Sequence, residues 1–168
     1  MDLRKSTENI LETLAKNEEV AGQLYAAYAD RFPETRGFWS DMADDEKTHA
    51  IWIRVLRDMA FAGRLSFKTD RFSVTAIGEF TNDIKNAIAK TAKGLDIDEA
   101  FSVALSIEES LIESKYFNAL DADNADLKKI LEDLETATRE HAQKLRETWK
   151  TSGKKQPTSN TERSGDIM

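Results

Sequence analysis

The apolar residues of this chain recur at intervals of three and four along four long segments, a spacing typical of amphipathic helices. The 168 residues include only seven glycines and two prolines, so few positions interrupt these helices. The composition also favours long helices over a sheet-rich fold. The pattern therefore predicts an all-α fold whose main helices cover approximately residues 3–30, 34–63, 98–120 and 126–150.

A longer segment separates the second predicted helix from the third. Residues 64–74 alternate only weakly and are interpreted as a connection, whereas the apolar residues of 76–93 are in helical register up to Gly94. Two helical hairpins joined in this way form a four-helix bundle with a long crossover that contains an extra helix. The candidate N-cap residues are Asp96 or Asp98 for the third bundle helix and Asn124 or Asp126 for the fourth.

The bundle is expected to form one domain over residues 1–150, since a chain of this length can bury a single hydrophobic core. From residue 151 onward the sequence is polar, and we expect a disordered tail over 151–168.

Charge and composition exclude several classes of function. The net charge of −7 argues against a nucleic-acid-binding protein, which would show a basic face. No apolar run is long enough to span a bilayer, and the N-terminus lacks the apolar core of a signal peptide, so a cytoplasmic location is expected. Cysteine is absent, which excludes disulfides, iron–sulfur clusters and rubredoxin-type iron centres. A metal site in this chain would have to use carboxylates and imidazoles.

Each main helix has a polar interruption in its apolar stripe. Two residues three positions apart lie about 60° apart around a helix, so both side chains can reach one point. Carboxylates and imidazoles from facing helices bind two iron or manganese ions in bundle cores. The interruptions are Glu18 in the first helix, Glu46 and His49 in the second, Glu108 or Glu109 in the third, and Thr138 and His141 in the fourth.

The second and fourth helices contain matching segments. MADDEKTHA at residues 42–50 aligns with LETATREHA at residues 134–142, and both histidines of the protein fall at the same place, each followed by alanine. Chance would rarely place the only two histidines at equivalent positions. This match is the strongest functional signal in the sequence.

Over roughly residues 3–150 the chain resembles the rubrerythrin and ferritin-like di-iron family. The segments that carry the resemblance are NEEVAGQLY, FWSDMADDEKTHA, IEESLIESKYF and REHA. The resemblance implies a bundle that binds two irons, with one Glu from the first helix of each hairpin and a Glu-x-x-His from the second. It would make Glu18 and Glu108 terminal carboxylate ligands, Glu46 a bridging carboxylate, and His49 and His141 the imidazole ligands.

Thr138 departs from the family pattern, because the second bridging glutamate should stand there. Four carboxylates would balance two divalent ions, whereas three carboxylates face a formal charge of +4 and leave the half near His141 weaker. Glu135 and Glu109 are candidates for partial compensation, although neither is in ideal register. The chain also has no cysteine-bearing electron-transfer module, so peroxidase activity does not follow from the resemblance.

Several site residues have a rival or a purely structural interpretation. Glu19 competes with Glu18 but lies off the strongest stripe, and periodicity does not choose between Glu108 and Glu109, where the resemblance favours Glu108. The histidines could instead be hydrogen-bonded core residues, with His141 left over from a lost site. The tyrosines are interpreted as core residues whose phenols can bond a ligand carboxylate; they are Tyr25, Tyr28 and Tyr116.

Two functional hypotheses follow. In the first, the protein is a rubrerythrin-like oxidoreductase that binds one or two iron ions, or manganese, in the bundle core. It reacts with O2 or peroxide and takes electrons from an external donor. In the second, the degenerate site has no redox activity, and the protein is a structural or binding module whose exposed helix faces serve a partner or a homodimer.

Overall fold

The computed structural model describes residues 3–67, 74–114 and 117–152, and within them the predicted all-α bundle is confirmed. Short 3-10 turns at Pro33–Thr35 and Phe117–Ala119 and two three-residue strands, β1 (Leu65–Phe67) and β2 (Leu120–Ala122), connect the helices. The α-helices are α1 (Leu3–Arg31), α2 (Arg36–Phe61), α3 (Val74–Lys93), α4 (Ile97–Ser114) and α5 (Ala125–Ser152). Among these described residues, no helix is both long and apolar enough to cross a membrane.

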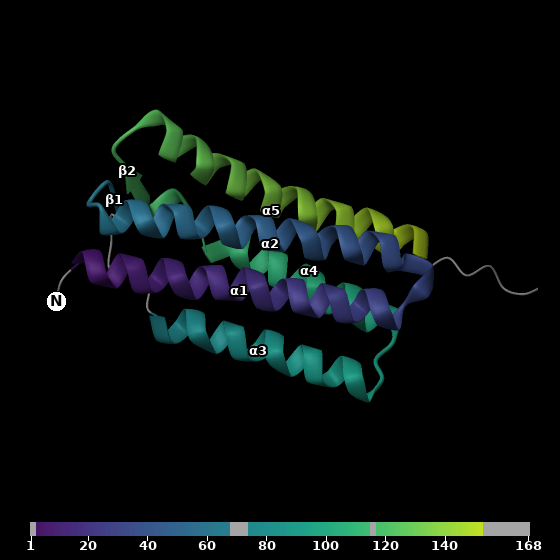
Figure 1. The fold of residues 1–168 in the computed structure, drawn as a ribbon. Helices are drawn as coiled ribbons and strands as arrows, with labels where there is room; N and C mark the ends of the chain where they lie inside the picture. The colour runs from purple at the N-terminus through teal and green to yellow at the C-terminus, as the bar shows by residue number, and fades with distance from the viewer. Residues whose placement is uncertain (1–2, 68–73, 115–116, 153–168) are drawn as a thin grey trace, which may run out of the picture.

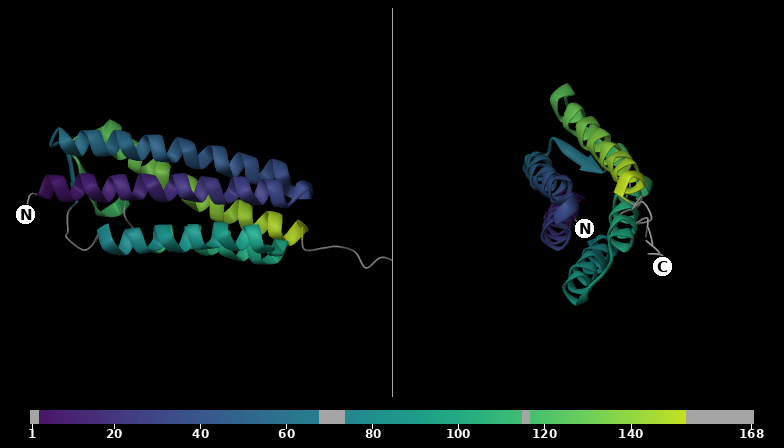
Figure 2. Two further views of the ribbon diagram at one scale, coloured as in Figure 1. Left: turned by 60° about the horizontal axis from the view of Figure 1, so that its bottom comes forward. Right: turned by 90° about the vertical axis from the view of Figure 1, so that its right-hand side faces the viewer.

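The bundle consists of two helical hairpins and one additional helix (Figure 1). α1 packs along α2, and α4 packs along α5. α3 packs along α1, on the side away from α5 (Figure 2). The end-on view in Figure 2 places the α1–α2 pair opposite the α4–α5 pair.

Local sequence explains where the helices begin and end. Gly63 and Gly94 follow α2 and α3 with φ of 76° and 101°, a conformation that glycine adopts without steric cost. Asp96 caps α4: its carboxylate accepts a bond from the N–H of Glu99 at 2.9 Å, and the Glu99 carboxylate accepts from the N–H of Asp96 at 3.1 Å. Asn124 caps α5, because its side-chain oxygen accepts the N–H of Leu127 at 2.9 Å.

The prediction that the third bundle helix extends to residue 120 was wrong. α4 ends at Ser114, and the chain continues through a turn into β2, which pairs antiparallel with β1. The connection at 64–74 therefore contains a strand that the sequence analysis missed. Leu65 and Leu120 are both buried in the apolar cluster that also contains Leu14 and Leu56. The strand pair therefore covers one end of the bundle, and the two strands hydrogen-bond each other's backbone.

One outer boundary also differs from the expectation. α5 continues to Ser152, beyond the expected limit at residue 150. The rest of the predicted tail, residues 153–168, lies outside the described residues, as does Tyr116.

A layer of polar side chains divides the apolar core in two. One cluster surrounds Tyr25, Trp39 and Phe101, and the other surrounds Leu14 and Leu56. Six buried polar residues lie at this level of the bundle. On α1, α2 and α5 they lie between the two clusters, and on α4 the residue lies beside the first cluster. We call these six the polar layer: Glu18, Glu46, His49, Glu108, Thr138 and His141. Because buried polar groups lose their hydration, each of these side chains needs a partner inside the bundle.

Candidate metal centre

The structure brings all five predicted site residues together in the polar layer. Each is at most 5% exposed, and they come from α1, α2, α4 and α5; they are Glu18, Glu46, His49, Glu108 and His141. Their role as metal ligands stays a prediction, but their convergence is a structural fact.

The rival glutamates lie at the surface. Glu19 forms an ion pair with Arg54 at 2.5 Å, and Glu109 forms one with Arg146 at 2.5 Å. Both carboxylates are more than two-fifths exposed. The structure thus places Glu18 and Glu108, rather than their neighbours, inside the bundle.

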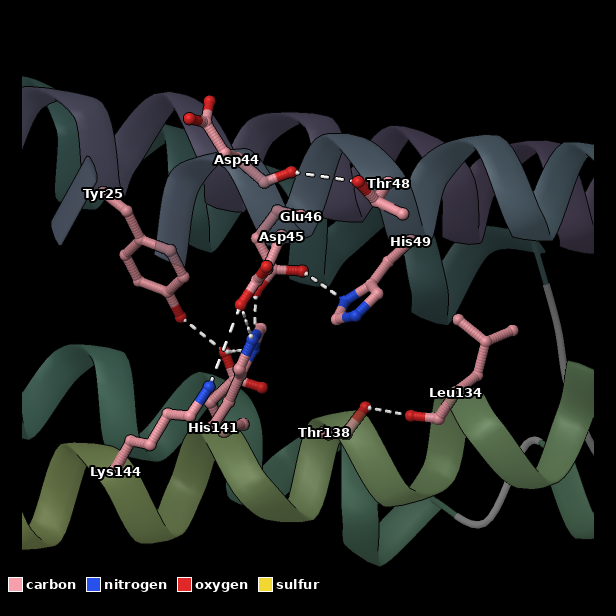
Figure 3. Close-up of polar contacts among 11 residues, drawn as sticks. Tyr25, Asp44, Asp45, Glu46, Thr48, His49, Leu134, Thr138, His141 and Lys144 are labelled. Carbon is pink, nitrogen blue, oxygen red and sulfur yellow. Dashed lines mark hydrogen bonds and ion pairs between the residues drawn. The ribbon is translucent and has the colours of Figure 1, made fainter. Parts of the chain in front are cut away.

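Glu46 stands at the centre of the layer. Its Oε2 lies 3.0 Å from Nδ1 of His49, and its Oε1 lies 3.1 Å from Nδ1 of His141 (Figure 3). The two imidazole rings are 5.1 Å apart between centroids. One ligand atom from each of these three residues lies within 4.8 Å of the other two, which makes them a group that could hold a metal ion.

His141 approaches Glu46 with a ring nitrogen that lacks a well-formed hydrogen bond. Nδ1 of His141 is buried, and despite its distance of 3.1 Å from the carboxylate it has no well-formed hydrogen bond. Buried imidazole nitrogens are normally satisfied, so an unsatisfied one that faces a carboxylate is the arrangement expected where both groups bind a third atom. The donor set, imidazole nitrogen plus carboxylate oxygen, suits iron or manganese.

Glu108 joins the layer from α4. Its Oε1 accepts a hydrogen bond from the hydroxyl of Tyr25 at 2.7 Å, and the same oxygen lies 3.6 Å from Nδ1 of His141. The expectation that a core tyrosine bonds a candidate ligand carboxylate is therefore confirmed for Tyr25. This hydrogen bond fixes the carboxylate on the side facing His141.

Asp45 is a site residue that the sequence analysis missed. Its Oδ2 lies 3.2 Å from Nε2 of His141, and Nζ of Lys144 lies 4.0 Å from the same oxygen. The carboxylate holds the outer nitrogen of the ring, so the inner nitrogen faces Glu46. Its position directly before Glu46 was the available signal, but Asp45 is off the apolar stripe and half exposed, and periodicity assigned it to the surface.

Thr138 turns away from the centre of the layer. Its hydroxyl donates to the backbone carbonyl of Leu134 at 2.9 Å, one turn earlier in α5 (Figure 3). A hydroxyl engaged in this way adds no negative charge to the layer. The departure from the family pattern is therefore visible in the geometry as well as in the sequence.

Gly22 allows α1 to approach α2 beside Glu46. A Cβ at this position would lie 3.2 Å from the carbonyl oxygen of Ala43 and 3.3 Å from Cβ of Glu46, closer than ordinary contacts. The missing side chain therefore keeps the carboxylate stem against α1, where Glu18 also lies one turn away.

Burial and mutual charge set the protonation of the carboxylates. Burial, followed by the charge of Glu46, raises the pKa of Glu18 well above its usual range. The same two causes raise the pKa of Glu108 to about 7. Burial alone would raise the pKa of Glu46, but its interactions with His141 and His49 outweigh burial and hold that pKa well below the usual range.

The pKa of His141 shifts in the opposite direction to that of Glu46. Burial would lower its pKa, but the carboxylates of Glu108 and Glu46 raise it to about 11. Without metal, these shifts favour an imidazolium at His141 beside the ionised Glu46. A metal ion that binds His141 must displace its proton, so metal binding is coupled to proton release.

Comparison with known proteins supports the family suggested by the motifs. The rubrerythrin family model matches residues 9–149, which include the polar layer and most of α1 and α5. No curated protein and no solved structure gives a significant match. Since the family model covers most of the chain, the protein belongs to the rubrerythrin family.

Proposed function

We propose that the protein binds iron in its polar layer and acts there as an oxidoreductase on O2 or peroxide. The observation that carries this proposal is the buried Glu46 carboxylate with an imidazole nitrogen at each of its oxygens, 3.0 and 3.1 Å away. Membership of the rubrerythrin family supports iron as the metal, with manganese as the second candidate.

The proposed metal site consists of the five buried acids and imidazoles. Glu46, His49 and His141 contribute the central donor atoms, and Glu18 and Glu108 complete the charge around them. When bound, iron supplies the ability to change between divalent and trivalent states. The apolar clusters on both sides keep bulk water out of the layer, while Asp45 and Tyr25 orient His141 and Glu108.

Turnover would require an external electron donor. The chain has no cysteine and therefore cannot form a cysteine-ligated electron-transfer centre of its own. A redox protein that docks on the helical surface would have to reduce the iron between cycles. Because the donor is a separate protein, the reaction of the ferrous protein with O2 or peroxide can be measured without it.

Thr138 favours a second candidate function. The layer lacks the fourth carboxylate, and His49 and His141 already have partners in Glu46 and Asp45 without any metal. On this alternative the site is structural, and the exposed helix faces serve a partner or a second copy of the chain.

Elemental analysis of protein purified from iron-supplemented cells tests the proposal. We expect at least one tightly bound iron per chain, and anaerobic titration of the metal-free protein with ferrous ion should restore it. Exposure of the ferrous protein to O2 or peroxide should then produce the absorbance of ferric iron. A protein that binds no iron in either experiment would favour the structural alternative.

A further inference from the structure

We propose that the polar layer holds a single metal ion on a face of two histidines and one carboxylate, instead of the pair of ions typical of the family. The three ligands are Glu46, His49 and His141. This inference rests on the proposed metal binding but goes further, because it fixes the number of ions and the protein atoms that bind them.

The three donor groups already lie close to single-ion geometry. A metal with bonds of about 2.1 Å places adjacent ligand atoms roughly 3 Å apart and opposite ones about 4.2 Å apart. One ligand atom from each of Glu46, His49 and His141 lies within 4.8 Å of the others. Both imidazoles present Nδ1 to the carboxylate, at 3.0 and 3.1 Å, so each nitrogen already lies at the spacing of an adjacent ligand from a carboxylate oxygen.

The other two acids lie outside this group. Among the described residues, the three-residue set is the one cluster with metal-binding spacing, and neither Glu18 nor Glu108 belongs to it. The oxygen of Glu108 that approaches His141 already accepts the hydrogen bond of Tyr25 at 2.7 Å. This bond holds the Glu108 carboxylate toward His141, outside the three-residue group.

Charge also favours one ion. A single divalent ion beside Glu46 is neutralised when Glu108, 3.6 Å from His141, is ionised as well. Two divalent ions would carry +4 against the three carboxylates of the polar layer, and Thr138 contributes only a hydroxyl that is bonded to Leu134. An uncompensated charge in a buried site is costly, so occupation of the second position is disfavoured.

A two-histidine, one-carboxylate face leaves several coordination positions open for oxygen, peroxide or water. The ion would also join the two hairpins, because Glu46 and His49 belong to α2 whereas His141 belongs to α5. Metal binding should therefore raise the thermal stability of the whole bundle, a readout that does not depend on activity.

Anaerobic titration of the metal-free, full-length chain with Fe²⁺, and separately with Mn²⁺, tests the inference. We expect one ion per chain by elemental analysis, a higher unfolding temperature, and the EPR spectrum of an isolated Mn²⁺ ion. Two ions per chain, or the EPR spectrum of a spin-coupled pair, would overturn the single-ion inference and leave the proposed iron binding intact. Binding of no ion would overturn both.

Variants test the ligand assignment. Glu46→Gln and His49→Gln should each abolish the stoichiometric ion. Glu18→Gln and Glu108→Gln remove nearby charge but none of the three ligands, so they should lower the affinity and still bind one ion per chain at saturating metal. Circular dichroism and thermal unfolding of each metal-free variant establish that the helical fold is retained, and the two ligand variants provide independent tests if one fails to fold. Loss of the ion in both Glu18→Gln and Glu108→Gln would overturn the three-residue face.

Discussion

The matching segments of α2 and α5 place histidines at equivalent positions but satisfy them differently. On α2, His49 pairs with Glu46 three residues earlier on the same helix, at 3.0 Å. On α5, the Thr138 hydroxyl donates to the backbone carbonyl of Leu134, and His141 instead faces Asp45 and Glu46 on α2. A histidine can therefore remain buried after its local acid is absent, provided that neighbouring helices supply the partners.

The comparison also identifies Glu46 as the residue that both halves share. Each of its oxygens faces a different histidine, so the α5 half depends on a carboxylate from α2. Among the described residues, no acid of α5 pairs with His49, and the hydroxyl of Thr138 donates to Leu134 instead. The two halves are therefore unequal, and the predictions below test that asymmetry.

Replacement of the shared carboxylate should have the largest effect. Glu46→Gln removes the negative charge between the two imidazoles, and we expect metal affinity to fall by more than about 100-fold, beyond the usual effect of a residue that only supports a ligand. Isothermal titration with Mn²⁺ measures the loss. Glu109→Gln is the matched control, because Glu109 pairs with Arg146 at the surface and should bind metal as the native chain does.

Thr138→Glu should make the α5 half equivalent to the α2 half. The added carboxylate supplies the missing charge, so a second ion should bind. The affinity for the first ion should rise by about 100-fold. The metal-free variant should lose about 3 kcal/mol of stability, because it buries an unpaired acid. Metal analysis and urea unfolding check both expectations.

Thr138→Val provides the steric control for this experiment. It keeps the shape of the side chain and removes only the hydroxyl that bonds Leu134, so stability should change by less than about 1 kcal/mol. No gain of metal in Thr138→Glu would mean that the packed core does not admit the carboxylate in a binding position.

Stability and metal affinity should depend on pH in opposite directions. The pKa values of Glu108 and His141 are raised to about 7 and about 11 in the folded chain, from 4.5 and 6.5. Each raised pKa contributes stability that is complete below the unfolded value and is lost as pH rises toward the folded one. The metal-free protein should therefore become less stable from about pH 5 to 9.

Metal must displace the same protons, so its affinity should rise about tenfold per pH unit for each proton released. Thermal unfolding of the metal-free and metal-loaded protein across this range measures both trends. Glu108→Gln should remove the part of the stability loss between pH 4.5 and about 7. A metal-free protein that gains stability over this interval would contradict the assignment.

Asp45→Asn should have the smallest effect, confined to the α5 half. The amide keeps a polar group near Nε2 of His141 but removes its charge, so metal affinity should fall by about tenfold. Asp44→Asn is the control, since the Asp44 carboxylate is exposed and forms its ion pair with Lys47 at the surface. Equal losses in the two variants would show that the effect is general surface charge.

Local sequence predicted the helices well because their signals are local. The apolar period, the glycines after α2 and α3 and the capping residues each act within one or two turns. The strand pair was missed because it joins residues 65–67 to 120–122, and neither segment has a strong strand pattern of its own. Tertiary packing also ended α4 at Ser114, where the apolar pattern alone continued.

The sequence by itself determined that the bundle would contain acids and histidines within its apolar stripes, and that Thr138 would leave one carboxylate missing. Its periodicity did not choose between Glu108 and Glu109, because each shares a helix face with apolar residues, and the family resemblance alone favoured Glu108. Only the packing of α4 against α5 and α1 placed Glu108 at Tyr25 and Glu109 at Arg146. Likewise, only the approach of α5 to α2 showed that Asp45 holds His141. Periodicity reports which face of a helix is buried, whereas partners on other helices depend on helix rotation and distance, which tertiary packing decides.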